Sequence, residues 1–239
     1  MKAAQQSKKV VIIIAEGNSE EYALYPFLKE LGKPLNIMFT ITHGDILSDY
    51  KNEKTSHKDV ISSVVNDFIK ERKFLKEDIL IVAQLTDTDG VFMDESKVIV
   101  DNSVERIKYS EEFIAIHNES QIDAIVNRNK LKSDKLKALV KTDFTLSNIP
   151  YKIYYFSCNL DHVLHGDPNS DGKAEKADEF ANSMNNSDIH DFFELQAIYD
   201  TENYEGSWEF VFNDNNSLKR GSNLILLLNE LNTLVPQVE

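Results

Sequence analysis

Two acidic segments contain the side chains that are best suited to chemistry. The segment EGNSE (16–20) and the segment DTDG (87–90) each follow an unbroken apolar run rich in Val and Ile. Carboxylates that lie close together repel one another unless they are protonated or share a cation. Ligand sets made only of oxygen suit Mg²⁺ or Mn²⁺. If the two segments meet in the fold, Glu16, Asp87 and Asp89 therefore predict a site for one of these cations.

The apolar runs predict the elements that would bring these acids together. Each run has the composition of a strand that is buried on both faces in a parallel sheet. We expect strands at 9–15, 36–42 and 79–86, separated by amphipathic helices at 19–31 and 59–74. This alternation is typical of a doubly wound α/β sheet, in which ligands bind beyond the carboxyl ends of the strands. The acids of both segments would then lie at the same rim.

The first predicted helix begins next to the first acidic segment. Asn18 can cap its N-terminus, and Glu21 three residues later completes a capping-box pattern. Pro26 lies inside the helix and predicts a kink or an irregular first turn. Acids in a first turn are also favoured by the helix dipole, so Glu20 has a structural explanation as well as a functional one.

Beyond residue 90 the pattern is less regular. We expect short strands at 98–100 and 113–116, and then a helical hairpin on the surface between 120 and 141. A further long strand at 151–157 is followed by a short capped helix. The remaining predicted elements are helices at 174–184, 189–199 and 217–234.

The charge balance argues against a broad electrostatic grip on nucleic acid or on an anionic membrane. The chain has 26 Lys and Arg residues against 40 Asp and Glu residues, a formal net charge of −14, whereas such polyanions are bound by basic patches. A local basic strip on the predicted hairpin, or a basic partner, would have to supply the attraction. The strip consists of Arg128, Lys130, Lys132, Lys135, Lys137 and Lys141, with Lys152 outside the hairpin.

The composition is that of a globular protein with a substantial core, because 41% of the 239 residues are hydrophobic. The apolar runs are much shorter than the roughly 20 residues that cross a membrane, and the polar segment 1–9 shows no secretory signal. The single cysteine, Cys158, excludes an internal disulfide and fits a reducing compartment. We therefore expect a cytoplasmic protein without a membrane segment.

The order of these motifs resembles the TOPRIM fold of topoisomerases, primases, recombination-repair proteins, OLD-type nucleases and RloB-like bacterial defence proteins. In that family a Glu-Gly pair ends a first strand, and Asp-x-Asp-Gly ends another strand two βα units later. The matching segments here are Glu16-Gly17 and Asp87-Thr88-Asp89-Gly90. Glu20 resembles the second acid of the nuclease branches. Asp161 resembles the acid that opens the next helix in RloB-like proteins, although the family usually has Glu there.

The resemblance covers roughly residues 9–165 without the insertion, and the C-terminal third matches no family; together with the predicted elements, this divides the chain into two parts. The first is a TOPRIM-like α/β domain at 8–165, a mostly parallel Rossmann-like sheet flanked by helices, with a helical insertion at about 91–148. The second is a helical C-terminal extension at 166–239 that packs on this domain.

The resemblance also implies cleavage of phosphodiester bonds with Mg²⁺ or Mn²⁺. Divalent ions held by the acids would polarise the scissile phosphate and activate water. By analogy, Glu16 would be a metal ligand or general acid/base, and Asp87 and Asp89 would bind metal. Glu20 would complete a second metal position, and Asp161 would be a further ligand.

The resemblance further implies an assisting lysine and a partner. In the family a lysine commonly stabilises the developing negative charge, and either Lys173 or Lys176 is placed to serve. Such proteins often work beside an ATPase, and a homo-oligomer is compatible with the sequence. The implied function is a nuclease acting on DNA or RNA in antiviral defence. The alternative is a non-catalytic regulatory subunit that keeps the acids to bind a metal or a phosphate.

Two other metal sites compete with the carboxylate rim. Cys158, His162 and His165 have the spacing of three zinc ligands, but no fourth ligand is evident. The segment 167–178 has acids or amides at loop positions one, three and five, Gly at six and an acid at twelve, as in an EF-hand-like calcium loop. Its eighth position is Ala and it has no second copy, so a solvated connector is the other interpretation.

Overall fold

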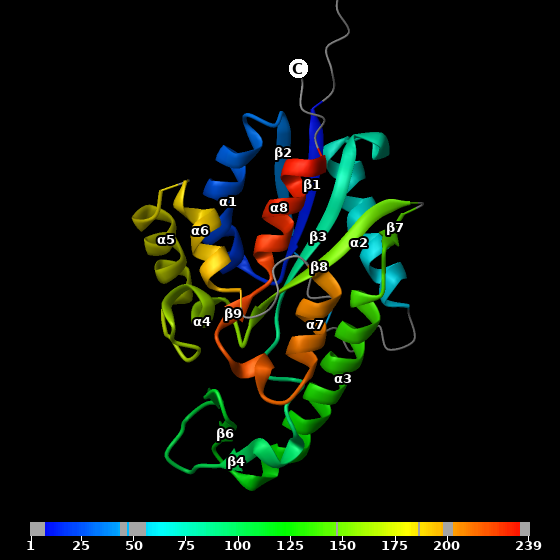
Figure 1. Cartoon of the computed structure of the whole chain (residues 1–239). Helices are drawn as coiled ribbons and strands as arrows, with labels where there is room; N and C mark the ends of the chain where they lie inside the picture. The colour runs from blue at the N-terminus through cyan, green and yellow to red at the C-terminus, as the bar shows by residue number, and fades with distance from the viewer. Residues whose placement is uncertain are drawn as a thin grey trace, which may run out of the picture.

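The computed structural model describes residues 8–43, 47, 56–146, 148–185, 187–197 and 203–234. One large sheet has helices on both faces, and a small second sheet lies at one end of the molecule (Figure 1). The strands are β1 (Lys9–Ala15), β2 (Ile37–His43), β3 (Ile79–Asp87), β4 (Val98–Val100), β5 (Lys108–Tyr109), β6 (Ile114–Ile116), β7 (Phe144–Thr145), β8 (Ile149–Ser157) and β9 (Gly221–Ser222). The helices are α1 (Asn18–Gly32), α2 (His57–Arg72), α3 (Ile122–Val140), α4 (Leu160–His165), α5 (Lys173–Ser183), α6 (Asp188–Leu195), α7 (Tyr204–Phe212) and α8 (Leu224–Leu234).

The large sheet has the strand order β2-β1-β3-β8-β7, and β9 also pairs with β8. Strands β2, β1, β3 and β8 run parallel, whereas β7 and β9 are antiparallel to β8. Strands β1 and β3 have parallel neighbours on both sides, and helices cover both faces of the sheet, which explains why their apolar runs do not alternate with polar residues. The predicted mostly parallel α/β sheet flanked by helices is confirmed.

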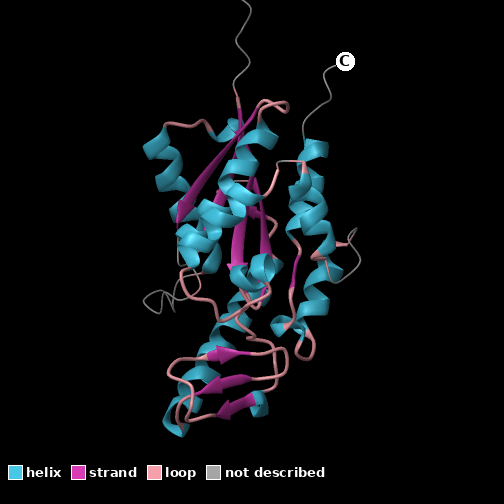
Figure 2. Cartoon of the chain, turned by 90° about the vertical axis from the view of Figure 1, so that its left-hand side faces the viewer, coloured by secondary structure: helices cyan, strands magenta, loops and turns pink. Residues whose placement is uncertain are grey.

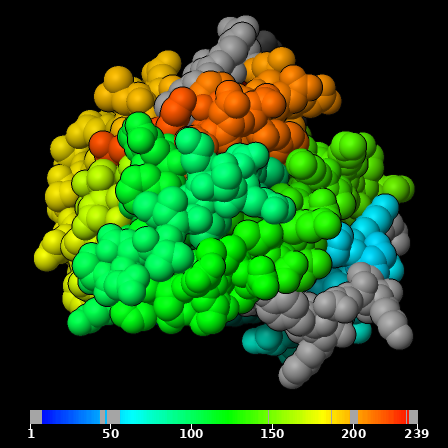
Figure 3. Space-filling view, turned by 90° about the horizontal axis from the view of Figure 1, so that it is seen from below, coloured from blue at the N-terminus to red at the C-terminus, as the bar shows by residue number. Residues whose placement is uncertain are grey.

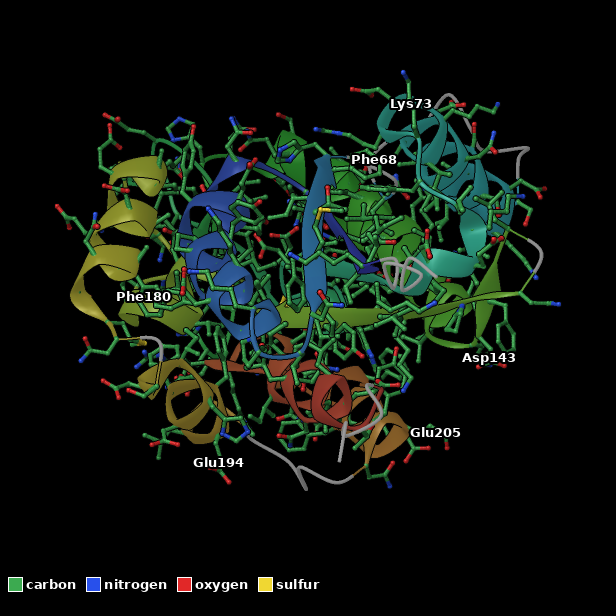
Figure 4. The ribbon with its side chains drawn as sticks, turned by 90° about the horizontal axis from the view of Figure 1, so that it is seen from above. Phe68, Lys73, Asp143, Phe180, Glu194 and Glu205 are labelled. Atoms are coloured by element: carbon green, nitrogen blue, oxygen red, sulfur yellow. The ribbon has the colours of Figure 1, made fainter. Side chains whose placement is uncertain are left out.

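The two faces of the sheet are packed against different helices. Val11 on β1 belongs to a hydrophobic core that includes side chains of α1, α5, α6 and α8. Val10, which points to the other face, belongs to a core with α2, α3 and α7. Viewed from above, Phe180 on α5 and Phe68 on α2 accordingly lie on opposite sides of the molecule (Figure 4).

The insertion differs from the predicted helical hairpin. Its helical part is one continuous helix, α3, and it also contains the small sheet β4-β6-β5, which stands apart from the large sheet (Figure 2). The helix continues because its two ends serve different cores. Near its start Ile125 packs with the small sheet, and near its end Leu136 and Leu139 pack on the large sheet. Its 19 residues span roughly 28 Å.

The C-terminal part also departs from the predicted helices. The helix expected at 217–234 begins only at Leu224, because Gly221 and Ser222 form β9 beside β8. Helix α6 ends at Leu195, and residues 198 and 199 of the predicted helix lie outside the described residues. Helix α7 was not predicted; its Trp208 is fully buried and donates a hydrogen bond to the Ile153 carbonyl at 3.2 Å. Among the described helices none is long and apolar enough to cross a membrane.

Candidate metal centre at the rim of the parallel sheet

The carboxyl ends of β1 and β3 place three of the predicted acids at one rim. Glu16 directly follows β1, Asp87 is the last residue of β3, and Asp89 lies two residues beyond it. The two strands are paired in parallel as far as Ile14, which lies opposite Gln84. A side-chain hydrogen bond from the Thr86 hydroxyl to the Glu16 carboxylate then joins the two strand ends. The two acidic segments therefore meet in the fold.

The turn after β3 is held rigidly by its backbone. Asp89 and Gly90 have positive φ angles of 50° and 67°, a conformation that Asp tolerates and Gly adopts freely. The Asp89 amide donates to the Cys158 carbonyl at 2.7 Å. A side chain on Gly90 would collide with Leu218, so the close approach of the C-terminal segment requires glycine here. These contacts fix the direction of the Asp89 carboxylate.

Asp87 and Asp161 face the rim from β3 and from the start of α4. The Asp87 carboxylate accepts a hydrogen bond from the Leu160 amide at 2.9 Å. Burial raises the pKa of Asp87 well above its usual range, and the charge of Glu16 adds to the rise. The Asp161 side chain is only 6% exposed, and its carboxylate lies 3.3 Å from the ammonium of Lys173 at the start of α5. Lys173 is therefore at the rim.

Lys132 on α3 lies buried at the rim, so its predicted place in a basic strip on the surface is wrong. Its ammonium lies 2.6 Å from Asp89 Oδ2 and 3.8 Å from Glu16 Oε1, and its side chain is only 10% exposed. One signal was present in the sequence, because Lys132 shares a helical face with Ile125 and Leu136 at spacings of seven and four residues. A lysine inside an apolar stripe needs an acidic partner.

The rim has more negative than positive charge. Burial raises the pKa of Glu16 to about 7; Asp89 adds to this rise and Lys132 opposes it. For Asp89 burial also favours the neutral acid, but the neighbouring Lys132 ammonium outweighs burial, so the pKa of Asp89 lies below its usual range. Burial disfavours the charged form of Lys173, yet Asp87 and Asp161 outweigh this and raise the pKa of Lys173.

Glu20 has a structural role in addition to its position near the rim. Its Oε2 accepts a hydrogen bond from the Gly17 amide at 3.1 Å, so Gly17 and Glu20 form the start of α1. The predicted cap by Asn18 and Glu21 is wrong, because Asn18 is already helical and the exposed Glu21 pairs with His43 at 3.0 Å. Burial raises the pKa of Glu20, and the charge of Glu20 in turn raises the pKa values of Glu16 and Asp87.

The donor set of the rim fits Mg²⁺ or Mn²⁺, with one restriction. All the acidic side chains offer oxygen, and their crowding leaves a negative excess that a cation would neutralise. Among the described residues, however, no three rim side chains have ligand atoms within 4.8 Å of one another. The one such group, His190 with Asp191 and Glu194, lies on α6. Any cation at the rim would therefore take fewer than three ligands from these side chains as they stand, and Mg²⁺ commonly completes its shell with water.

The competing zinc and calcium sites are not assembled in the described residues. Cys158 is buried, and burial raises the pKa of its thiol above the usual range, which disfavours the thiolate that zinc needs. His165 packs edge-on against the Phe180 ring. In the segment 167–178, Asp171 pairs with Arg106 of the insertion at 2.5 Å. The segment thus attaches the insertion to the main fold.

Comparisons with known proteins give no family for the chain. No protein-family model matches it, and searches of curated proteins and of solved structures likewise find no match.

Proposed function

We propose that this protein is a Mg²⁺- or Mn²⁺-dependent nuclease built on a TOPRIM-like sheet. The observation that carries the proposal is the meeting of Glu16, Asp87 and Asp89 at the ends of adjacent parallel strands. Two lysines, Lys132 and Lys173, flank these acids. Clustered acids suit a divalent cation, and nearby ammonium groups suit the negative charge that develops on a phosphate during cleavage.

Each rim residue has a role in this proposal that follows from its surroundings. A bound cation would polarise the scissile phosphate and lower the pKa of an attacking water. Asp87 and Asp89 are its proposed ligands, with Asp161 next to them on α4. Glu16, with a pKa of about 7, is able to take up or release a proton near neutral pH. Lys173, whose side chain is 53% exposed, is accessible to a phosphate oxygen.

A groove beside α3 supports a polyanionic substrate. It has a volume of about 280 Å³, and its charged lining consists of Lys130, Lys137 and one acid, Glu95. The Lys137 ammonium lies 5.7 Å from the centre of the Phe92 ring, which also lines the groove. A larger hollow of about 470 Å³ is lined by more acids than lysines and suits an anion less. The insertion forms the centre of the face seen from below (Figure 3). A basic or ATPase partner would add to this limited positive surface.

A second candidate function is a non-catalytic subunit that binds a metal or a phosphate. The specific observation in its favour is that Lys132 already neutralises Asp89 and approaches Glu16. In that case the acids would hold a ligand or a partner without turnover. Binding of Mn²⁺ and nucleic acid with no cleavage product would favour this function over the nuclease.

The deciding experiment is a cleavage assay with the purified protein. Plasmid DNA, single-stranded DNA and tRNA are each incubated with Mg²⁺, Mn²⁺, Ca²⁺ or EDTA. We expect cleavage with Mg²⁺ or Mn²⁺ and none in EDTA. The double variant Glu16→Gln/Asp89→Asn should be inactive, whereas the control Asp171→Asn, which changes an acid away from the rim, should cleave like the unmodified protein. Cleavage by the double variant would contradict the proposed site.

A further inference from the structure

Lys132 occupies the place between two strand ends where a cation is needed. Its ammonium is 2.6 Å from Asp89 Oδ2, which follows β3, and 3.8 Å from Glu16 Oε1, which follows β1. Glu16 and Asp89 are 73 residues apart in the chain. The single positive charge of Lys132 therefore connects the two acidic segments. In the absence of a metal, this charge offsets the repulsion that would otherwise push the two carboxylates apart.

Helix α3, which carries Lys132, is held in place by contacts along its length. Four residues later Leu136 is fully buried in the core under the sheet. Three residues later Lys135 donates to the Leu47 carbonyl at 2.6 Å. The start of the same helix packs on the small sheet of the insertion through Ile125. The position of the Lys132 ammonium is therefore coupled to the position of the insertion.

A lysine ammonium and a divalent cation cannot share one Asp89 oxygen. At separations near 4 Å, like charges repel strongly in a partly buried site, and the Lys132 side chain is only 10% exposed. A cation that takes Asp89 Oδ2 as a ligand must therefore displace the ammonium, and a cation on Oδ1 would still lie close enough to Lys132 for repulsion to push the ammonium away. The flexible four-carbon stem of lysine permits this displacement without movement of the α3 backbone.

We propose that Lys132 is a positioning residue that acts as a built-in counter-ion, holding Asp89 and Glu16 in place until a divalent cation displaces it. The inference rests on the proposed cation site. It adds that Lys132 competes with the metal for Asp89 and thereby lowers the affinity of the site for the metal. The released ammonium would remain at the rim, where a phosphate bound to the cation would provide its new partner.

Metal binding to Lys132→Met tests the inference. Methionine keeps an unbranched apolar stem and removes the charge. We expect Mn²⁺ to bind at least about tenfold more tightly to this variant in calorimetry, because the competing charge is gone. The melting temperature in EDTA should fall, because the acids lose their counter-ion. Lys132→Arg, which keeps the charge, should not bind Mn²⁺ more tightly, and Lys141→Met controls for the loss of a positive charge just beyond the end of α3.

A second measurement uses the unmodified protein, in case Lys132→Met folds poorly. Acylation of lysines by a soluble acetylating reagent, followed by peptide mass spectrometry, should modify Lys132 slowly in EDTA and several-fold faster with saturating Mg²⁺. Lys135, buried on the same helix, serves as the internal reference and should not change. An unchanged rate at Lys132 would show that the ammonium is not displaced, and would overturn the inference.

The outcomes separate this inference from the nuclease proposal. Weaker or equal Mn²⁺ binding by folded Lys132→Met, with cleavage by the unmodified protein intact, contradicts only the counter-ion role. Tighter binding by the variant without cleavage by any form supports the counter-ion role and contradicts the nuclease. No Mn²⁺ binding by any form contradicts both.

Discussion

The rim of the large sheet and the segment 167–178 are both rich in acids, yet only the rim brings them together. At the rim, adjacent parallel strands end side by side, and buried carboxylates there influence one another's pKa. In the segment 167–178, Asp171 is 84% exposed and turns toward Arg106 of the insertion. Acids distant in the sequence are therefore brought together by the pairing of parallel strands. Regular spacing of oxygen-bearing residues along one loop does not bring them together in the segment 167–178.

The largest expected difference between the two regions is in catalysis. Asp87→Asn should lower Mg²⁺-dependent cleavage at least about 100-fold, because it removes a proposed ligand and its charge. The amide oxygen can still accept the Leu160 hydrogen bond. Since burial and Glu16 disfavour the charge at Asp87, its loss should raise the free energy of unfolding in EDTA by about 1 kcal/mol. Rates of cleavage and urea unfolding measure both effects.

The matched change in the other region is Asp171→Asn, for which neither cleavage nor metal binding should change. If Asp87→Asn is instead less stable than the unmodified protein in EDTA, then the Asp87 carboxylate is favourably placed without a cation. In that case repulsion and burial would not destabilise the rim acids, and the rim would not differ electrostatically from the exposed segment 167–178.

Each of the two regions contains a glycine with a positive φ angle, and the two angles are nearly equal. Gly90 (67°) ends the rim turn, and Gly172 (68°) precedes α5. Alanine at either position is strained by about 1 kcal/mol. At position 90 it would also collide with Leu218, whereas at position 172 it would meet only the flexible end of Glu175. We expect Gly90→Ala to cost about 3 kcal/mol of unfolding free energy and Gly172→Ala about 1 kcal/mol. Equal losses in urea denaturation would contradict the close packing at the rim.

The sequence was sufficient for the parts of this molecule that depend on local patterns. The strands β1 and β3 follow from continuous Val and Ile runs, and the placement of acids after them follows from how parallel sheets end. The short strands β4 and β6 were also predicted closely. These features need only composition, turn residues and one general rule of topology.

The remaining features depend on long-range packing, which a single sequence does not specify. Lys132 reaches Asp89 only because α3 is one long helix that spans two cores, and a hairpin would have turned it away. Ser222 pairs with β8 although its neighbours form a helical pattern. These two misses are tertiary contacts that override a plausible local pattern. The cap of α1 is an exception because it is local: Gly17, rather than Asn18, precedes the first turn, and the Glu20 carboxylate accepts the hydrogen bond of the Gly17 amide.

The buried acids of the rim should make the stability of the fold depend on pH near neutrality, whereas the exposed acids should not. Burial raises the pKa of Glu16 from 4.5 to about 7, so the folded protein binds a proton in this range more tightly than the unfolded chain. The resulting stabilisation is fully present below pH 4.5 and is lost as the pH rises through 7. In EDTA we expect the free energy of unfolding to fall by about 2 kcal/mol between pH 5 and pH 8.

Glu16→Gln should reduce this decline without abolishing it, because glutamine does not titrate whereas burial still raises the pKa of Asp87, and Asp171→Asn should leave it in place. Saturating Mg²⁺ should also reduce it, since a cation offsets the charge of Glu16. Urea unfolding at four pH values measures the slope. If Glu16→Gln retains the full decline, the titrating group lies elsewhere in the fold.

The smallest expected effect concerns the link between the insertion and the segment 167–178. Arg106 and Asp171 approach to 2.5 Å but are half exposed and largely exposed, so their coupling in a double-mutant cycle should be below about 1 kcal/mol. Asn169 adds two hydrogen bonds to the Tyr109 backbone at 2.7 and 2.8 Å. Those bonds remain in Asp171→Ala, which should therefore melt within a few degrees of the unmodified protein. The shift should be the same with calcium and with EDTA, because Asp171 serves the insertion. If calcium raises the melting temperature of the unmodified protein and Asp171→Ala abolishes this rise, then the segment 167–178 does bind calcium. The chain would then have a second acidic site beside the rim.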